Sequence, residues 1–330
     1  MIAALLERLR MGDRNALARL VSFVARGEHL AELNIALGHA VNREGEAPAE
    51  PEASANAIAG ASGSAGASPS RSPCPARVVA FTGSGGVGKS SLIGKLIPIV
   101  RAQSKKIAIL ACDPQSPLSG GALLGDRFRM GSPLDDGIFI RSLAAVSGRG
   151  AIADHVDVMI RLCEAFGFDV IFVETVGSGQ GDVAVRNLAD VVVLLLQPES
   201  GDDVQWEKAG ILECADLVVI HKADLPSADQ TAAQVRMALD LSSACHVPVL
   251  RVSTKANQGH AELWEAIDAL PLRRQQTSAA RLLFQLAAEA LEQRFREGDP
   301  EVLKVAEAWQ RGELPTADAV QAVLRILTHV

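Results

Sequence analysis

One short stretch of this chain constrains its fold more than any other. An apolar run from Val78 to Phe81 leads into Gly83-Ser84-Gly85-Gly86-Val87-Gly88-Lys89-Ser90, and a helical pattern from Ser91 to Val100 follows. The spacing is GxxxxGK[ST], and it lies between a strand and a helix, as this pattern requires. Glycines let the backbone amides point inward, and a helix N-terminus adds partial positive charge. The sequence therefore predicts a phosphate-binding loop.

The residue types in this loop indicate a nucleoside triphosphate with Mg²⁺. Lys89 would place its charge against the β- and γ-phosphates, and the Ser90 hydroxyl would coordinate the magnesium ion. The expected contacts with nucleotide are Gly83, Ser84, Gly85, Gly86, Val87, Gly88, Lys89, Ser90 and Ser91.

Apolar runs separated by helical stretches predict the fold class. Continuous apolar strands joined by helices form a mostly parallel sheet that is covered on both faces, so we expect a doubly wound α/β fold of the P-loop NTPase type. The runs are Val78 to Phe81, Ile107 to Leu110, Ile138 to Ile140, Val170 to Val173, Val191 to Leu196, Leu217 to Ile220 and Val249 to Val252.

Carboxylates follow two of these runs. Glu174 ends one strand and could hold magnesium through water, while the amide of Gly177 just beyond could sense the γ-phosphate. Asp113 follows another strand and would face the ligand crevice, as a metal ligand or a water-positioning group. Asp126 is a further candidate, although Gly125-Asp126 is also ordinary turn chemistry. Gln180 could position the attacking water.

A base-recognition segment follows a later strand. His221-Lys222-Ala223-Asp224 resembles the NKxD segment that reads guanine, with histidine in place of the usual asparagine. Asp224 can accept from both guanine N1–H and the 2-amino group, and the Lys222 stem would lie along the ring. The His221 ring could donate toward the base or the loop. Ser253, Thr254 and Lys255 follow the next strand and are expected near guanine O6, so GTP and GDP are the predicted ligands.

The distribution of apolar and small residues along the chain divides it into four parts. Residues 1–41 carry apolar residues at helical spacing with a break at Gly12-Asp13, and predict a small helical cap. Residues 42–75 are rich in Ala, Ser, Gly and Pro and predict a disordered linker. Residues 76–272 form the expected nucleotide-binding domain. Residues 273–330 form a helical tail, whose last helix Thr316 could cap. The cap positions expected to be buried are Leu5, Leu6, Leu9, Leu17, Leu20, Val21 and Val24.

Composition excludes several classes of function. A net charge of -7 over 330 residues argues against nucleic acid as a partner. No apolar run reaches the roughly 20 residues of a membrane span, and charges lie early in the N-terminal segment, so we expect a cytoplasmic protein. The five cysteines are scattered without metal-ligand spacing, which indicates buried free thiols.

Taken in order, these motifs resemble the MeaB/ArgK family, the GTPase chaperones associated with methylmalonyl-CoA mutase. The resemblance rests on MGDRNALARL, TGSGGVGKSSLIGKL, LACDPQSPLSGGALLGDRFRM, GFDVIFVETVGSGQGDVAV and GDDVQWEKAGILECAD, and covers nearly everything except the linker. It implies a homodimer that dimerises through the helical tail. It also implies GTP hydrolysis with Mg²⁺, and the protection or cofactor loading of an adenosylcobalamin-dependent acyl-CoA mutase.

The resemblance also assigns roles to residues. It places Asp113, Asp126 and Glu174 in the metal and switch machinery, together with a mobile switch around Gly177, Gln180 and Asp182. It marks Asp202, Gln205 and Lys208 as a loop that responds to nucleotide and partner. The departures from the family pattern are His221, the long linker and Pro117-Leu118-Ser119.

Several alternatives stay open at this stage. A partitioning-type ATPase would carry a lysine where Ser84 stands, and a nickel-delivery GTPase would need Cys/His clusters that the sequence does not display. A nucleotide-gated binding protein with negligible hydrolysis, or a metallochaperone of the same superfamily, would share the loop. An arginine-transport kinase is disfavoured because no further phosphoacceptor or catalytic-base motif is present.

Overall fold

The protein is described from a computed structural model that covers residues 1–41, 76–114, 135–145, 152–176, 182–198, 211–241, 246–276, 287, 291, 294–295 and 298–328. The chain divides into two compact units, Met1–Leu272 and Arg273–Val330. The predicted linker at residues 42–75 and the Pro117-Leu118-Ser119 segment lie outside the described residues.

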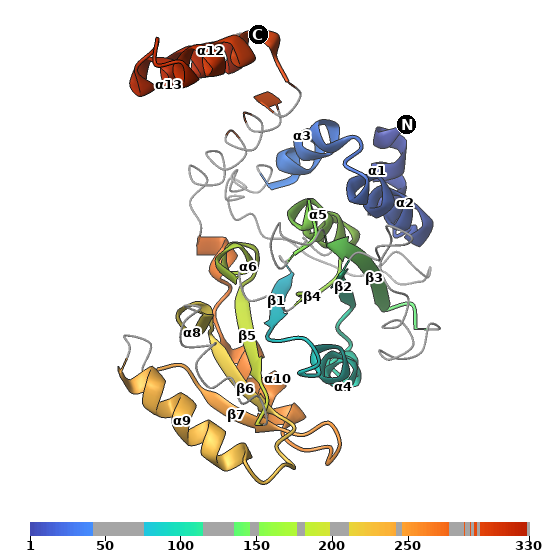
Figure 1. Cartoon of the computed structure of the whole chain (residues 1–330). Helices are drawn as coiled ribbons and strands as arrows, with labels where there is room; N and C mark the ends of the chain where they lie inside the picture. Colours follow the sequence, from blue (N-terminus) through green and yellow to red (C-terminus); the bar gives the residue numbers. More distant parts are fainter. Residues whose placement is uncertain are drawn as a thin grey trace, which may run out of the picture. The chain divides into compact units, whose positions relative to one another are not determined.

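A parallel sheet forms the centre of the first unit (Figure 1). Among the described residues it has seven strands in the order β3-β2-β4-β1-β5-β6-β7, and every pairing is parallel. All seven apolar runs of the sequence are strands, which confirms the α/β fold with a doubly wound sheet. The strands are β1 (Arg77–Thr82), β2 (Ile107–Pro114), β3 (Ile138–Ala145), β4 (Val170–Glu174), β5 (Val191–Leu196), β6 (Leu217–His221) and β7 (Val249–Val252).

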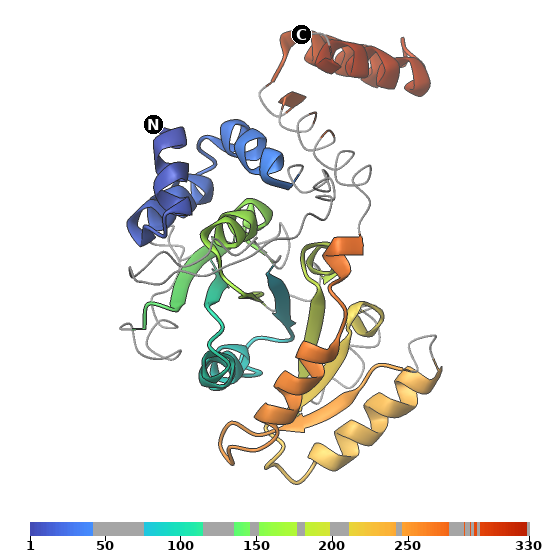
Figure 2. The ribbon, with the colours of Figure 1, turned by 180° about the vertical axis from the view of Figure 1, so that it is seen from behind.

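Helices cover both faces of this sheet, as the two ribbon views show (Figures 1 and 2). Alternate residues of β1 point to opposite faces, so Val78 and Ala80 lie in one apolar cluster while Val79 and Phe81 lie in another. The first cluster includes α5 (Val156–Phe166), and the second includes α4 (Lys89–Ala102) and α10 (His260–Ala269). Burial on both faces explains the continuous apolar runs. The remaining helices of this part are α6 (Asp182–Leu188), α8 (Ile211–Cys214) and α9 (Ala228–Leu241).

Three N-terminal helices pack against the sheet through α5. They are α1 (Ile2–Arg10), α2 (Arg14–Ala25) and α3 (Leu30–Val41). Asp13 caps α2 by accepting from the amides of Asn15 (2.8 Å) and Ala16 (3.3 Å). The break that the sequence predicted at Gly12-Asp13 is therefore the point at which α2 starts. The apolar positions predicted for this cap are buried and share one cluster with the residues of α5.

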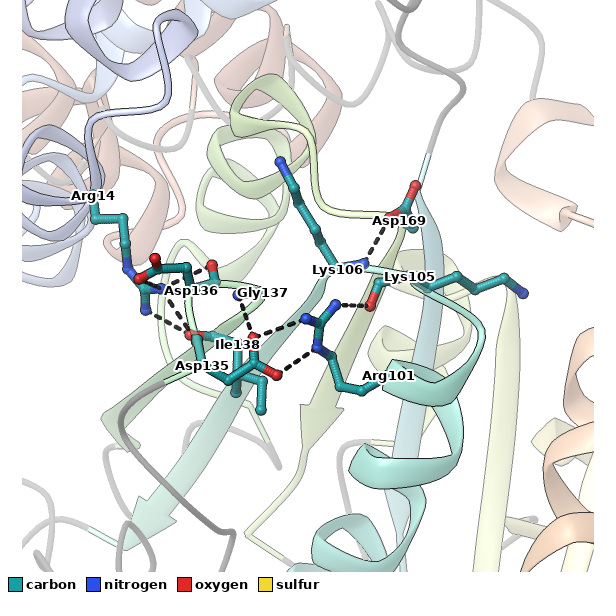
Figure 3. A network of polar contacts seen from close by, with 9 residues as sticks. All are labelled: Arg14, Arg101, Lys105, Lys106, Asp135, Asp136, Gly137, Ile138 and Asp169. Atoms are coloured by element: carbon teal, nitrogen blue, oxygen red, sulfur yellow. Dashed lines mark hydrogen bonds and ion pairs between the residues drawn. The ribbon is translucent and has the colours of Figure 1, made fainter. Parts of the chain in front are cut away.

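A polar network joins α2, α4 and the turn before β3 (Figure 3). Arg14 of α2 donates to the backbone carbonyls of Asp135 (3.4 Å), Asp136 (2.9 Å) and Ile138 (2.5 Å). Arg101 of α4 donates to both carboxylate oxygens of Asp135, at 2.7 and 2.8 Å. This guanidinium holds the pKa of Asp135 below its usual range. The network therefore fixes the entry to β3 and attaches the N-terminal helices to it.

We expect Arg14→Ala to lower the free energy of unfolding by about 1–2 kcal/mol, because the charge-assisted hydrogen bonds to the carbonyls of Asp135, Asp136 and Ile138 are lost. Urea unfolding followed by circular dichroism would measure the change. Arg19→Ala is the matched control, since Arg19 is an exposed arginine of the same helix. Equal losses for the two variants would show that the Arg14 contacts do not stabilise the fold.

The second unit contains a pair of helices, α12 (Pro300–Gln310) and α13 (Thr316–Thr328), after a short 3₁₀ turn, η3 (Arg273–Gln276). The cap predicted at Thr316 is wrong, because Thr316 is already the first residue of α13. Its hydroxyl instead accepts a hydrogen bond from the indole nitrogen of Trp309 at 3.2 Å, which ties the two helices together.

The sequence also gave expectations about membrane spans and cysteines. None of the described helices is both long enough and apolar enough to cross a membrane. Cys112, Cys163 and Cys214 are buried free thiols, as predicted, whereas Cys74 and Cys245 lie outside the described part of the chain. Burial raises the pKa of Cys112 to about 12.

Candidate functional site

The carboxyl ends of the parallel strands meet along one edge of the sheet, and the candidate site is built there. Strand register places Glu174 of β4 beside Phe81 of β1 and beside Ala111 of β2, two residues before Asp113. On the other side, His221 of β6 pairs with Val252 of β7. The carboxyl ends of these strands therefore lie along the same edge of the sheet, where the ligand crevice of such a sheet is expected.

The predicted phosphate loop connects β1 to α4. The helix begins at Lys89, two residues before the predicted start at Ser91, and Ser91 is exposed in its first turn. Gly83 has φ 140°, and a Cβ there would lie 2.3 Å from the Leu195 carbonyl oxygen of β5. Gly88 has φ 101°, and a Cβ there would lie 2.5 Å from the His221 ring. These two positions require glycine for both conformation and space.

Lys89 lies inside the loop, not in solvent. Its side chain is buried, and its amine donates to the carbonyl oxygens of Gly83 (2.8 Å) and Ser84 (3.1 Å). The loop is thus wrapped around the cation, while the outer residues Ser84, Gly85 and Gly86 are exposed. A phosphate that enters the loop would meet a positive charge already held in place.

Beneath the loop, Ser90 and Glu174 are joined directly. The Ser90 hydroxyl donates to a Glu174 carboxylate oxygen at 2.6 Å, and both Glu174 and Asp113 are buried. Asp113 lies within β2, which runs to Pro114, so the strand is longer than the sequence predicted. A hydroxyl and buried carboxylates form an oxygen donor set of the kind that Mg²⁺ prefers. In the described ranges no group of three or more His, Cys, Asp or Glu side chains could hold a metal ion.

The predicted base-recognition residues gather on the loops after β6 and β7. The Ser253 hydroxyl donates to Asp224 at 2.6 Å, and this hydrogen bond lowers the pKa of the Asp224 carboxyl. Lys255 is exposed and its amine lies 3.8 Å from the same carboxylate. Lys222 has φ 56° and donates to the Gln197 side chain at 2.6 Å, just past the end of β5. The carboxylate is therefore oriented before any base binds.

His221 contacts protein groups through both ring nitrogens. Nδ1 lies 2.7 Å from the Val87 carbonyl oxygen of the phosphate loop, and Nε2 lies 2.8 Å from the Thr254 hydroxyl. Of the two roles that the sequence left open, the structure shows the contact with the loop. The ring thus joins the phosphate loop to the segment after β7.

Other candidates lie outside the described residues. These are Asp126, Gly177 and Gln180, together with Asp202, Gln205 and Lys208. Asp182 begins α6, and only its backbone is described.

Sequence reasoning missed two contacts at this edge. Gln197 accepts from Lys222, and the Thr175 hydroxyl donates to Thr82 at 3.2 Å, which ties the tip of β4 to the tip of β1. The position of Gln197 just beyond the carboxyl end of β5 was a signal that could have identified it, because that edge faces the ligand.

Comparisons with known proteins place this site in a family. The pattern of the family described as methylmalonyl-CoA mutase-associated GTPase MeaB matches residues 70–299. A Pyrococcus abyssi protein that carries a GTPase name is 39% identical over 274 residues, which cover 81% of this chain and 75% of that protein. A fused isobutyryl-CoA mutase of Geobacillus kaustophilus is 36% identical over 233 residues, which cover 70% of this chain and 19% of that protein.

The crystal structure of a protein titled LAO/AO transport system kinase is similar in fold. Its TM-score is 0.59 at 23% identity, with 99% of this chain and 98% of that chain covered. The identity is low, so this likeness shows the fold alone. The sequence match, in contrast, extends over most of the chain and includes the whole phosphate loop. This protein belongs to the MeaB family of methylmalonyl-CoA mutase-associated GTPases.

Proposed function

We propose that this protein binds GTP and GDP with Mg²⁺, hydrolyses GTP, and acts as a chaperone for an adenosylcobalamin-dependent acyl-CoA mutase. In this role it would assist cofactor loading and protect the mutase, and it would act as a homodimer through its helical tail. The family supports the GTPase activity and the link to a mutase.

The phosphate side of the reaction is supported by Lys89, Ser90 and Glu174. Lys89 would exchange the carbonyls of Gly83 and Ser84 for oxygens of the β- and γ-phosphates, and so neutralise charge where it develops. Ser90 and Glu174, with Asp113, would hold a magnesium ion directly or through water. A magnesium ion held there would supply positive charge that neutralises charge developing on the phosphates. Asp126 and Gln180 remain sequence-based candidates for the switch and for water positioning.

The base side is supported by the Asp224 carboxylate. One of its oxygens accepts from Ser253, which fixes the side chain on the loop after β6. A fixed, ionised acceptor suits the N1–H and 2-amino donors of guanine, whereas adenine offers no such pair. We therefore propose guanine over adenine, with Lys222, Thr254 and Lys255 around the base.

The observation that carries the proposal is the hydrogen bond from Ser90 to Glu174 directly beneath the loop that encloses Lys89. It joins two motifs that lie far apart in sequence, and supports the proposal that a phosphate and a metal ion would bind beside them. A direct test compares the binding of fluorescent GDP and fluorescent ADP, with and without Mg²⁺. GDP is expected to bind more tightly than ADP. Equal binding of GDP and ADP would overturn the guanine assignment.

The mutase link rests on the family description and on the fused isobutyryl-CoA mutase among the relatives. We expect a purified adenosylcobalamin-dependent acyl-CoA mutase to raise GTP turnover, and Lys208→Ala to reduce this stimulation more than the basal rate. The reason is that Lys208 matches a family loop outside the phosphate, magnesium and base segments, where partner binding could complete the transition-state arrangement. GTP turnover with and without mutase is the measurement.

Lys106→Ala is the control for this experiment. Lys106 is an exposed lysine at the amino end of β2, on the edge of the sheet opposite the site. The mutase should stimulate GTP turnover of the Lys106→Ala variant as strongly as that of wild type. Equal fold-stimulation of wild type and Lys208→Ala would reject the coupling role of Lys208, and no stimulation of wild type by methylmalonyl-CoA or isobutyryl-CoA mutase would reject these two mutases as partners.

A further inference from the structure

The loop after β6, residues 222–227, is held by the strands on both sides of it. In the sheet, β6 lies between β5 and β7 (Figure 1). On the β7 side, the Ser253 hydroxyl donates to Asp224 at 2.6 Å, and the Ala223 amide donates to the Val252 carbonyl at 3.1 Å. These contacts hold the carboxylate that is proposed to read guanine. Lys222, the first residue of the loop, is held from the other side.

The contacts on the β5 side come from the two residues that follow this strand. The Lys222 amine donates to Oε1 of Gln197 at 2.6 Å. The Ser227 hydroxyl donates to the backbone carbonyl of Pro198 at 3.4 Å. One contact lies at the start of the loop and the other at its end. The loop is therefore attached to the end of β5 at both of its ends.

The Lys222 side chain is held at both ends as well. Its backbone has φ 56°, which is uncommon for a residue with a side chain, and its carbonyl accepts from the Leu225 amide at 3.0 Å. Its ammonium group is held by Gln197, and the side chain is half-buried. With the backbone and the ammonium group both in place, the methylenes between them keep few of their rotamers. The lysine stem is thus ordered without nucleotide.

The position of Gln197 is set by β5. This strand lies between β1 and β6, and it contacts the phosphate loop directly, because a Cβ at Gly83 would lie 2.3 Å from the Leu195 carbonyl oxygen. Gln197 follows two residues later, at the carboxyl edge of the sheet, and is half-buried. Gln197 therefore relates the Lys222 ammonium group to the phosphate loop through a rigid strand.

We propose that Gln197 is a positioning residue that orders the Lys222 side chain before nucleotide binds, so that the lysine stem is ready to pack against the guanine ring. The inference rests on the proposed function, because it concerns the affinity for guanine nucleotide. A side chain that is already ordered loses less conformational entropy when the base binds, so the affinity is higher. Gln197 acts through Lys222 and needs no contact of its own with the nucleotide.

Methionine is the matched replacement at position 197, because it has about the length of glutamine but no amide oxygen. The experiment measures the dissociation constant of fluorescent GDP with Mg²⁺ for wild type, Gln197→Met, Lys222→Ala and the double variant. We expect Gln197→Met to bind GDP roughly threefold to tenfold more weakly, since one long side chain must then be ordered during binding. Gln234→Met changes an exposed glutamine of α9 and should leave the affinity unchanged.

The double variant tests whether Gln197 acts through Lys222. In Lys222→Ala the ammonium group is absent, so the further change Gln197→Met should alter the affinity by less than about twofold. A full loss in that background would show that Gln197 supports the site in another way, and would overturn the proposal. An unchanged affinity for GDP in a Gln197→Met protein with the melting temperature of wild type would also overturn it.

A readout without nucleotide separates this proposal from the proposed function. An ammonium group held in a hydrogen bond exchanges its hydrogens slowly with water and gives its own ¹⁵N–¹H NMR signal. In the nucleotide-free protein we expect this signal for Lys222, assigned by its loss in Lys222→Ala, in wild type and in Gln197→Glu, which keeps an acceptor oxygen. Gln197→Met should lose it. Absence of the signal from wild type, or its persistence in Gln197→Met, would overturn the proposal. Failure of wild type to bind GDP would instead overturn the proposed function.

Discussion

Lys89→Ala is expected to weaken GDP binding by roughly 100-fold or more, because the cation that the phosphate loop encloses is removed. The amine is buried and held by the carbonyls of Gly83 and Ser84, so its charge faces the loop interior in a fixed position. Loss of two charge-assisted hydrogen bonds to phosphate corresponds to about 3 kcal/mol. Isothermal titration calorimetry with GDP and Mg²⁺ would measure the change.

Two controls make this result specific. Lys106→Ala removes an exposed lysine at the opposite edge of the sheet and should leave the affinity as it is. The melting temperature without nucleotide checks that Lys89→Ala still folds, since the loop carbonyls lose their donor. An unchanged affinity for GDP in a folded Lys89→Ala protein would contradict the assignment of the phosphate site.

Asp224→Asn should weaken GDP binding by about 2 kcal/mol or more, roughly 30-fold, while ADP binding changes little. The carboxylate is an acceptor for two guanine donors, and an amide would place an N–H against one of them. Ser253 donates to Asp224 and keeps it ionised well into the acid range, so the effect should persist across neutral and mildly acidic pH.

The measurement is the affinity for fluorescent GDP and ADP, side by side, in wild type and variant. Asp240→Asn on α9 is the control, because Asp240 is an exposed aspartate on the outer helix. It should leave both affinities unchanged. Equal losses of GDP and ADP affinity in Asp224→Asn would show that this carboxylate supports the loop without reading the base.

The sequence alone predicted the strands and the phosphate loop, because these structures depend on residues that are close together along the chain. Apolar runs predicted the seven strands of the described residues, because strands buried on both faces select apolar residues at nearly every position. The spacing from Gly83 to Ser90 predicted the loop between β1 and α4 because backbone conformation and helix start are local properties. The cap predicted at Thr316 was wrong because α13 already begins at Thr316, whose hydroxyl accepts from Trp309 of the neighbouring helix.

Only the tertiary structure decided which distant side chains share a hydrogen bond at the site. Ser90 meets Glu174, Lys222 meets Gln197, and His221 lies between Val87 and Thr254. In each case the partners lie far apart in sequence. They meet because the strands run parallel, which places the carboxyl ends of the strands at one edge of the sheet. His221 departs from the guanine-binding pattern of the sequence, and only the structure shows that its ring contacts both Val87 and Thr254. Hydrogen bonding depends on distance and direction in space, and local sequence patterns do not contain either quantity.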